Sequence, residues 1–236
     1  MSKNQTVHCN DCPSQGKGIF CELEKLTLDD VSDHKVDNTY KKGQTLFVQG
    51  NPPFGMYCIS SGNIKVSQVG EDGKESIVRI ASAGDVLGHR SIFTDQYYNA
   101  TATAIDETKV CFIDKKYILK LVKESPSVAA NLIAKLGRDL GAAETRISSF
   151  YQKNVRERLA ELLLLLKESH GIKEDNKMRL DIKLTREEMA SIIGTASETL
   201  IRFMTELKNE GFIEQSGKVI YIIDEEGLLD FANISY

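Results

Sequence analysis

The hydrophobic pattern of the chain changes near Pro126. Before that point, from about residue 40 to residue 115, short apolar runs alternate with Gly and Asn residues. Many short strands at regular spacing are typical of an antiparallel sandwich or roll. The segment Glu71-Asp72-Gly73 is a hairpin-turn signal between two of the runs. The strands that this pattern predicts are 44–48, 56–59, 64–69 and 76–80.

After Pro126, apolar residues recur at alternating steps of three and four positions, which predicts a helix over residues 126–152. A helix that only covers its own core usually has a wider apolar face than this narrow seam, so we expect a coiled coil between two copies. Gly137 and Gly141 each weaken an isolated helix by roughly 1 kcal/mol relative to Ala, so it would rely on its partner. The expected dimer contacts are Ile133, Leu136, Leu140, Ala143, Ile147 and Phe150.

A further helix is expected over residues 155–169, with Gly171 as its C′ residue. A helix-turn-helix pattern comes after it. The capping box 185–188 starts a short helix that Gly194 breaks. A second capping box, 195–198, is expected to open a helix that runs to about residue 209. The hairpin 213–223, turning at Ser216-Gly217, would form the wing.

The second of these helices carries residues suited to reading DNA bases. Glu198 and Arg202 are four positions apart, so they project on one side; Glu accepts from cytosine, and Arg donates twice to guanine. The alternative is a surface ion pair worth a few tenths of a kcal/mol. The pair alone does not decide between them, but the complete unit with its wing favours DNA. The predicted DNA contacts are Arg186, Thr195, Ser197, Glu198, Ile201, Arg202, Lys208 and Lys218.

Charge counts against this interpretation without excluding it. The 236-residue chain has a net charge of −4, and residues 152–236 hold 12 Lys and Arg against 16 Asp and Glu. DNA contact requires only a local basic face. The chain has no run of 18 apolar residues and no secretory signal pattern, so we expect a cytoplasmic protein without a membrane partner. No P-loop, G-x-S-x-G or H-E-x-x-H motif is present, and no enzyme is predicted.

The five cysteines suggest a metal or redox function. An odd number of cysteines in a chain without a signal peptide argues against a disulfide framework. Cys9 and Cys12 lie close together in a polar, Cys-rich segment, 1–22, that we expect to need something external to hold it. Cys58 and Cys111 fall in predicted strands, where free Cys is commonly buried.

The sequence resembles the CRP/FNR family of dimeric transcription regulators over nearly its whole length. The resemblance rests on residues 184–190, 193–202 and 211–213, and, in the roll, on residues 42–47, 57–62 and 83–88. It implies an α+β fold with a cyclic-nucleotide-binding-type jelly roll, a long dimerisation helix and a winged helix-turn-helix. The expected parts are a Cys-rich segment 1–22, a sensor roll 23–125, a dimer helix 126–152 and a DNA-binding domain 153–236.

The resemblance puts Glu198 and Arg202 on the family's two base-reading positions and Arg186 on a phosphate-contacting position. Catabolite activators carry an Arg where this chain has Ser197, and the oxygen regulators often carry a Ser where it has Ile201. These differences argue against a catabolite-activator half-site and favour a TTG-like one. The implied partners are a palindromic operator, a second copy of the chain and RNA polymerase.

The resemblance also indicates which signal the roll senses. Family members that bind cyclic nucleotides use a Glu for the ribose and an Arg for the phosphate. This chain has His89 and Asn99 at those positions, and Arg90 occupies a Leu position. Burying a phosphate without the Arg is costly, so no cyclic nucleotide is expected.

The oxygen-sensing branch of the family binds a [4Fe–4S] cluster through three N-terminal cysteines and one cysteine of the roll. By that resemblance the ligands are Cys9, Cys12, Cys21 and Cys111, although eight residues between Cys12 and Cys21 exceed the usual gap. Four thiolates also suit zinc. The branch has an acidic residue where this chain has Ala143, so we expect a dimer with or without the cofactor.

The leading hypothesis is therefore a dimeric DNA-binding regulator controlled by an Fe–S cluster that responds to O₂, NO or redox state. A second hypothesis is a regulator of the same fold that senses a haem-bound gas or a small organic ligand. In that case His8, His34, His89 or a Cys would be the axial ligand. A third, of another class, is a cyclic-nucleotide-type adaptor that does not bind DNA.

Overall fold

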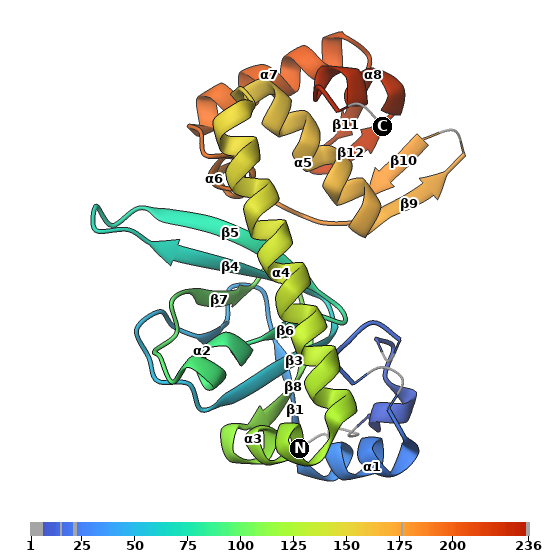
Figure 1. Cartoon of the computed structure of the whole chain (residues 1–236). Coiled ribbons are helices and arrows are strands. Elements are labelled where there is room, and N and C mark those ends of the chain that lie inside the picture. The colour runs from blue at the N-terminus through green and yellow to red at the C-terminus, as the bar shows by residue number, and fades with distance from the viewer. Residues whose placement is uncertain (1–6, 15, 21–22, 176, 235–236) are drawn as a thin grey trace. The chain divides into compact units, whose positions relative to one another are not determined.

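The structure is a computed structural model that describes residues 7–14, 16–20, 23–175 and 177–234 (Figure 1). Cys21, one of the four predicted metal ligands, lies outside the described residues. The chain forms two compact units, Met1–Gly141 and Ala142–Tyr236. No helix in the described ranges is long and apolar enough to cross a membrane.

The first unit contains the predicted antiparallel roll, made of two four-stranded sheets. The first sheet has the order β1 (Lys35–Tyr40), β8 (Thr108–Asp114), β3 (Gly55–Ser61) and β6 (Val86–Leu87). The second has the order β2 (Thr45–Phe47), β7 (Thr101–Ala104), β4 (Asn63–Val69) and β5 (Glu75–Ser82). All four predicted strands are confirmed. The turn at 71–73 joins β4 to β5, and Gly73 supplies the positive φ of 76° that the turn requires.

One apolar core brings together residues of both sheets. Ile59 of β3, Ile64 of β4, Ala102 of β7 and Val110 of β8 are each at most 1% exposed. Side chains alternate between the two faces of a strand, so each strand contributes every second residue to this core. The period-two pattern in the sequence therefore specifies which face of each strand is inside.

A second core joins the first sheet to helices. It includes Val31 of α1 (Lys25–His34), Ile118 of α3 (Lys115–Glu124) and Val128 at the start of α4. Both α1 and α3, and the short α2 (His89–Thr94), were absent from the sequence predictions. These helices have at most ten residues, so they depend on packing rather than on a strong pattern of their own.

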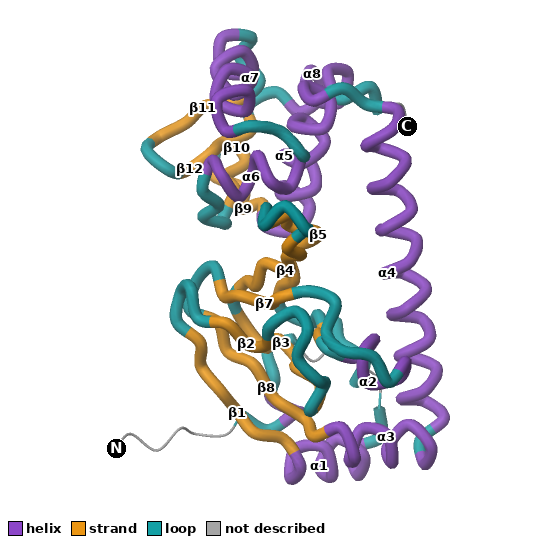
Figure 2. Tube along the Cα trace, turned by 90° about the vertical axis from the view of Figure 1, so that its left-hand side faces the viewer, coloured by secondary structure: helices purple, strands orange, loops and turns teal. Residues whose placement is uncertain are grey.

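Helix α4 spans Pro126–Gln152, as the heptad pattern predicts, and is one continuous helix in Figure 2. Val128 and Leu132 are buried. Ile133, Leu140 and Ile147, on the predicted seam, are 69%, 62% and 58% exposed. No described residue packs over these three side chains closely enough to shield them from water.

The second unit contains the predicted winged helix-turn-helix. In chain order its elements are α5 (Val155–His170), β9 (Gly171–Glu174), β10 (Lys177–Leu180), α6 (Arg186–Ile193), α7 (Ser197–Asn209), β11 (Ile213–Ser216), β12 (Val219–Ile222) and α8 (Glu225–Phe231). The capping box of Thr185 and Glu188 is confirmed. Gly194 ends α6 with φ 67°, and a Cβ there would lie 2.7 Å from the ring of Phe150. The hairpin β9–β10 and helix α8 were not predicted.

Two local predictions in this unit are wrong. The capping residue of α7 is Ala196, and no side chain caps the helix. Thr195 instead donates its amide to the carbonyl oxygen of Ala190 (3.0 Å), so it closes the preceding helix. Gly171 is extended, with φ −75° and ψ 130°, rather than left-handed, because the chain enters strand β9 directly.

Candidate functional site

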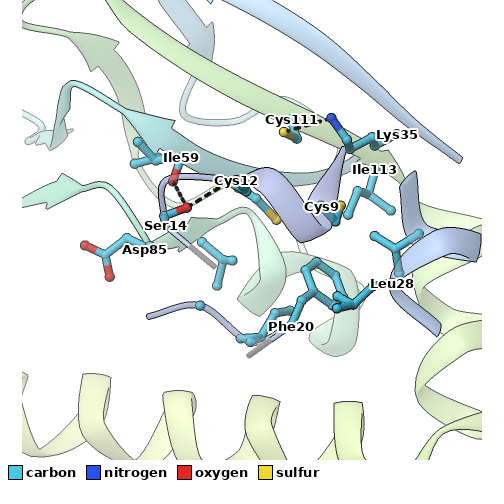
Figure 3. A pocket seen from close by; sticks show the side chains of 16 residues that line it. Cys9, Cys12, Ser14, Phe20, Leu28, Lys35, Ile59, Asp85, Cys111 and Ile113 are labelled. Atoms are coloured by element: carbon cyan, nitrogen blue, oxygen red, sulfur yellow. Dashed lines mark hydrogen bonds between the residues drawn. The ribbon is translucent and has the colours of Figure 1, made fainter. Parts of the chain in front are cut away.

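A cleft in the first unit brings together cysteines from distant parts of the sequence (Figure 3). Cys9 lies in the 3₁₀ helix η1 (Cys9–Asp11), Cys12 follows it, and Cys111 lies in β8. All three line the same cleft, together with Cys58 of β3. The structure thus unites the three predicted metal ligands that it describes.

The described part of the Cys-rich segment is held by the protein itself. The Cys9 amide donates to Ser32 Oγ of α1 (2.9 Å), and Asn10 Nδ2 donates to Asp29 Oδ1 (3.1 Å). Ser14 Oγ donates to the carbonyl oxygen of Ile59 (3.3 Å). For these residues, the expected anchor from outside the segment is supplied by α1 and β3 of the same chain.

Strand register explains why the roll presents two thiols to the cleft. Asp37 of β1 is directly opposite Cys111 of β8, and Cys111 is directly opposite Cys58 of β3. Directly opposed residues project on the same face of a sheet. Cys58, which the sequence suggested was only a buried strand residue, therefore also lines the cleft. The sequence alone could not identify this neighbour, because alternation does not reveal which strands pair.

Most of the cleft side chains that could hold a metal centre are thiols. Within the ranges that the structure describes, no three His, Cys, Asp or Glu side chains are close enough to hold a metal ion. A single zinc ion needs its sulfurs within about 2.3 Å of it. In a [4Fe–4S] cluster, the cysteine sulfurs bind different irons of one larger group. Thiolates are ligands of both zinc and Fe–S clusters, so the donor chemistry of the cleft admits either.

Burial shapes the chemistry of these thiols. It raises the pKa of Cys9 and Cys58, and it raises the pKa of Cys111 to about 12. The three groups are consequently protonated at neutral pH in the metal-free protein. A metal centre binds thiolates, so its binding must release these protons.

A buried cation lies at the Cys111 side of the cleft. The Lys35 side chain is 3% exposed, is paired with the Asp37 carboxylate, and donates to Cys111 Sγ (3.6 Å; Figure 3). Burial on its own would lower the pKa of Lys35, but the hydrogen bond to Asp37 and the negative charge of that carboxylate raise it. Lys35 therefore remains an ammonium group inside the protein.

A second polar cluster surrounds His89, the first residue of α2. His89 is 3% exposed, and its Nε2 lies 3.5 Å from Asp139 Oδ2 of α4. Neither ring nitrogen has a partner at regular hydrogen-bond geometry among the described residues. Asp139 also pairs with Arg79 (3.3 Å) and Lys135 (2.5 Å). Burial would raise the pKa of Asp139, but the adjacent His89 ring, the hydrogen bond from Lys135 and the charge of Arg79 hold it well below its usual range.

The predicted base-reading side chains are accessible. Glu198, Ile201 and Arg202 are exposed on α7, whereas Leu200 and Met204 are buried on its inner face. Glu198 and Arg202 form no ion pair with any residue that the structure describes. The Arg202 guanidinium instead lies 4.8 Å from the centre of the Phe203 ring. In this structure the two side chains are therefore exposed and are not paired with each other.

The other predicted DNA contacts have varied surroundings. Arg186 of α6 is half-buried and donates to Gln215 Oε1 of β11, so it ties α6 to the wing. Lys208, near the end of α7, and Lys218, in the wing turn, are exposed. Thr195 and Ser197 are half-buried at the start of α7. The basic residues thus belong to α6, α7 and the wing of one unit.

Both units match known protein families. Residues 37–125 match the "Cyclic nucleotide-binding domain" model, and residues 157–231 match the "Crp-like helix-turn-helix domain" model. The chain is 28% identical over 211 residues to the "CRP-like cAMP-activated global transcriptional regulator" of Mycobacterium tuberculosis, covering 89% of this chain and 94% of that protein. The chain belongs to the CRP/FNR family of transcription regulators. Members of this family are DNA-binding regulators rather than enzymes.

Other comparisons agree with membership of the CRP/FNR family. The chain is 26% identical over 231 residues to the "Fumarate and nitrate reduction regulatory protein" of Vibrio cholerae, covering 97% of this chain and 92% of that protein. The structure of FixK2 from Bradyrhizobium japonicum matches with a TM-score of 0.76 and 22% identity, over 86% of this chain and 99% of that one. That structure supports the fold alone. CRP-type and FNR-type relatives are about equally similar to this CRP/FNR regulator, so they leave its effector open.

The charge cluster around Asp139 yields a prediction for this CRP/FNR regulator. We expect Asp139→Asn to lower the free energy of unfolding by about 1 kcal/mol at pH 7, because three cationic or ionisable partners lose their carboxylate. The folded pKa lies below the unfolded value of 3.8, so this contribution is present above pH 3.8 and is lost as the pH falls toward the folded pKa. Urea denaturation at pH 7 and pH 3 measures the difference.

The matched control is Asp33→Asn, which removes an exposed carboxylate from α1. It should leave the unfolding free energy nearly unchanged at both pH values. A loss for Asp139→Asn that is as large at pH 3 as at pH 7 would contradict this electrostatic account.

Proposed function

We propose that this chain is a homodimeric, sequence-specific regulator controlled by a [4Fe–4S] cluster on Cys9, Cys12, Cys21 and Cys111. Its partners are a palindromic operator and RNA polymerase. The bound cluster supplies a centre whose state changes on reaction with O₂ or NO or on a change of redox potential. The protein's part is to hold the four thiolates and to relay the change to its DNA-binding unit.

The observation that carries the cofactor proposal is the cleft shared by Cys9, Cys12 and Cys111. These residues are separated by up to about one hundred positions in the sequence, yet their side chains line one space. The same space contains an ammonium group, Lys35, that favours negatively charged contents. Cys21 lies outside the described residues, and its role as the fourth ligand is what the resemblance to the oxygen-sensing branch implies.

The local charges argue against a cyclic nucleotide, even though a family model and a relative are named for one. His89 and Asn99 stand where the resemblance requires the ribose-binding Glu and the phosphate-binding Arg. The carboxylate of Asp139 lies 3.5 Å from His89 Nε2 and would repel a phosphate. The cations near it, Arg79 and Lys135, are already paired with Asp139.

The exposed seam of α4 supports a dimer. The seam exposes large apolar side chains at heptad spacing. Packing against the same seam of a second copy would bury their apolar surface, which is favourable in free energy. Phe150 differs from the other seam residues, since its ring also packs against the guanidinium of Arg158 (4.8 Å) in its own unit. Two copies present two α7 helices, which two half-sites of a palindrome require.

The DNA-reading proposal predicts a sequence-specific defect. Arg202→Ala and Glu198→Ala should each cost about 1–3 kcal/mol of binding, confined to one base pair of each half-site, because each residue loses its hydrogen bonds to one base. The target is the operator that the wild-type protein selects from random palindromes, with binding measured at fixed salt by fluorescence anisotropy.

Glu210→Ala, at the far end of α7, serves as the control and should bind like the wild type. Failure of the wild-type protein to select any sequence would support an adaptor that does not bind DNA. Equal losses on every sequence would mean that these residues do not read bases.

The cofactor proposal predicts iron and sulfide in protein purified without oxygen. The wild type should be brown, and air should bleach its charge-transfer absorbance. Cys9→Ala and Cys111→Ala should retain far less iron, because each removes a ligand, while Cys58→Ala in the same cleft should retain wild-type amounts. Colourless wild-type protein without iron after anaerobic reconstitution would refute the cluster, and a Soret band would favour haem.

The dimer proposal predicts that a charge on the seam separates the copies. Leu140→Lys should yield monomers, because a lysine replaces an apolar contact, whereas Ser148→Lys, on an exposed face outside the seam, should not. Size-exclusion chromatography with light scattering measures the mass. Ala143 leaves the seam uncharged, so cluster-free wild type should remain dimeric, and a clean monomer would refute this.

A further inference from the structure

Lys35 is an unusual residue to find inside the cysteine cleft. Its side chain is 3% exposed, and its ammonium group contacts the Asp37 carboxylate and Cys111 Sγ, the latter at 3.6 Å. Lys is almost never fully buried unless it is paired, because removing the charge from water is costly. A function for this cation must therefore be sought in what surrounds it.

Fold stability does not account for the Lys35–Asp37 pair. A buried ion pair is generally no more stabilising than apolar residues of the same size, and the neighbouring core of Val31, Met56 and Ile113 is apolar. Besides Asp37, the titratable groups that act on Lys35 are the thiols of Cys111 and Cys9, which are neutral in the metal-free protein. When a metal centre binds, these thiols become thiolates, and Lys35 then has negatively charged sulfur beside it.

A cluster held by four thiolates carries net negative charge, since a [4Fe–4S]²⁺ core offsets only two of the four ligand charges. Net charge and hydrogen bonds to the sulfurs set the stability and reduction potential of such centres. Lys35 already supplies both a positive charge and an N–H donor at Cys111, one of the proposed ligands.

We infer that Lys35 is a positioning residue of the cluster, which donates to the Cys111 sulfur and offsets part of the charge of the bound centre. Asp37 pairs with the ammonium group and holds it in place. Asp37 is also anionic and lies directly opposite Cys111 on the neighbouring strand, so its charge acts on the bound centre in the opposite direction to the charge of Lys35. The inference rests on the proposed cluster, but it concerns residues that the resemblance to the CRP/FNR family does not identify.

The opposite charges of Lys35 and Asp37 provide a sharp test. Lys35→Met keeps the length of the side chain but removes its charge and donor, so iron should pass to a chelator about tenfold faster or more, as for other partners of metal ligands. The reduction potential should become more negative. Removing the positive charge destabilises the reduced cluster, which is more negative, by more than it destabilises the oxidised cluster. Asp37→Asn should shift the potential in the positive direction without faster iron loss.

The measurements use full-length protein reconstituted without oxygen, with iron and sulfide analysis before each experiment. Lys41→Met, an exposed lysine after β1, is the control for the loss of one positive charge and should match the wild type. Lys35→Met leaves the Asp37 carboxylate without its counter-ion. The double variant Lys35→Met/Asp37→Asn removes both charges of the pair and so avoids this problem. It should also lose iron faster than the wild type.

The outcomes distinguish this inference from the proposed function. Wild-type iron retention and potential in both Lys35 variants would overturn the role of Lys35 and leave the cluster intact. Equally fast iron loss from Lys35→Met and Asp37→Asn would also overturn it, because the pair would then act only through the fold. Absence of iron from the wild type would overturn the cluster itself, and with it this inference.

Discussion

The register of β8 between β1 and β3 is the constraint on which the cofactor cleft depends. It aligns Asp37, Cys111 and Cys58 across three neighbouring strands of one sheet. Side chains alternate along a strand, so a slip of one residue would turn Cys111 into the opposite face. The buried side chains of Val110 and Ile113 prevent such a slip, because it would expose apolar surface. The apolar core thus fixes the geometry of the thiols.

Charge within the first unit is arranged in two separate places. At the cleft, a buried ammonium group stands beside thiols that become anionic only when they bind a metal centre. Beside His89, the Asp139 carboxylate of α4 binds Arg79 of the roll, and Lys135 links Asp139 to Asp85 (3.0 Å), which lines the cleft. Ion pairs therefore connect the cleft wall to the helix that carries the proposed dimer seam.

The sequence predicted the large elements well because they have strong periodic patterns. Six apolar residues at heptad spacing between positions 133 and 150 predict α4, which has 27 residues, and alternating residues predict the strands of the roll. Short elements were missed, since α1, α3 and the hairpin β9–β10 gain their stability from packing rather than from pattern. The error at Thr195 has the same origin: the motif for a helix cap was present, but the preceding turn used the residue instead.

The sequence by itself determined the α+β architecture, the helix-turn-helix with Glu198 and Arg202 on an accessible face, and the presence of unpaired thiols. Only the tertiary structure decided that Cys58 shares the cleft with Cys9, Cys12 and Cys111, and that Lys35 is buried beside them. The reason is physical. Local pattern fixes which face of an element is apolar, whereas the pairing of strands distant in sequence fixes which polar groups meet inside.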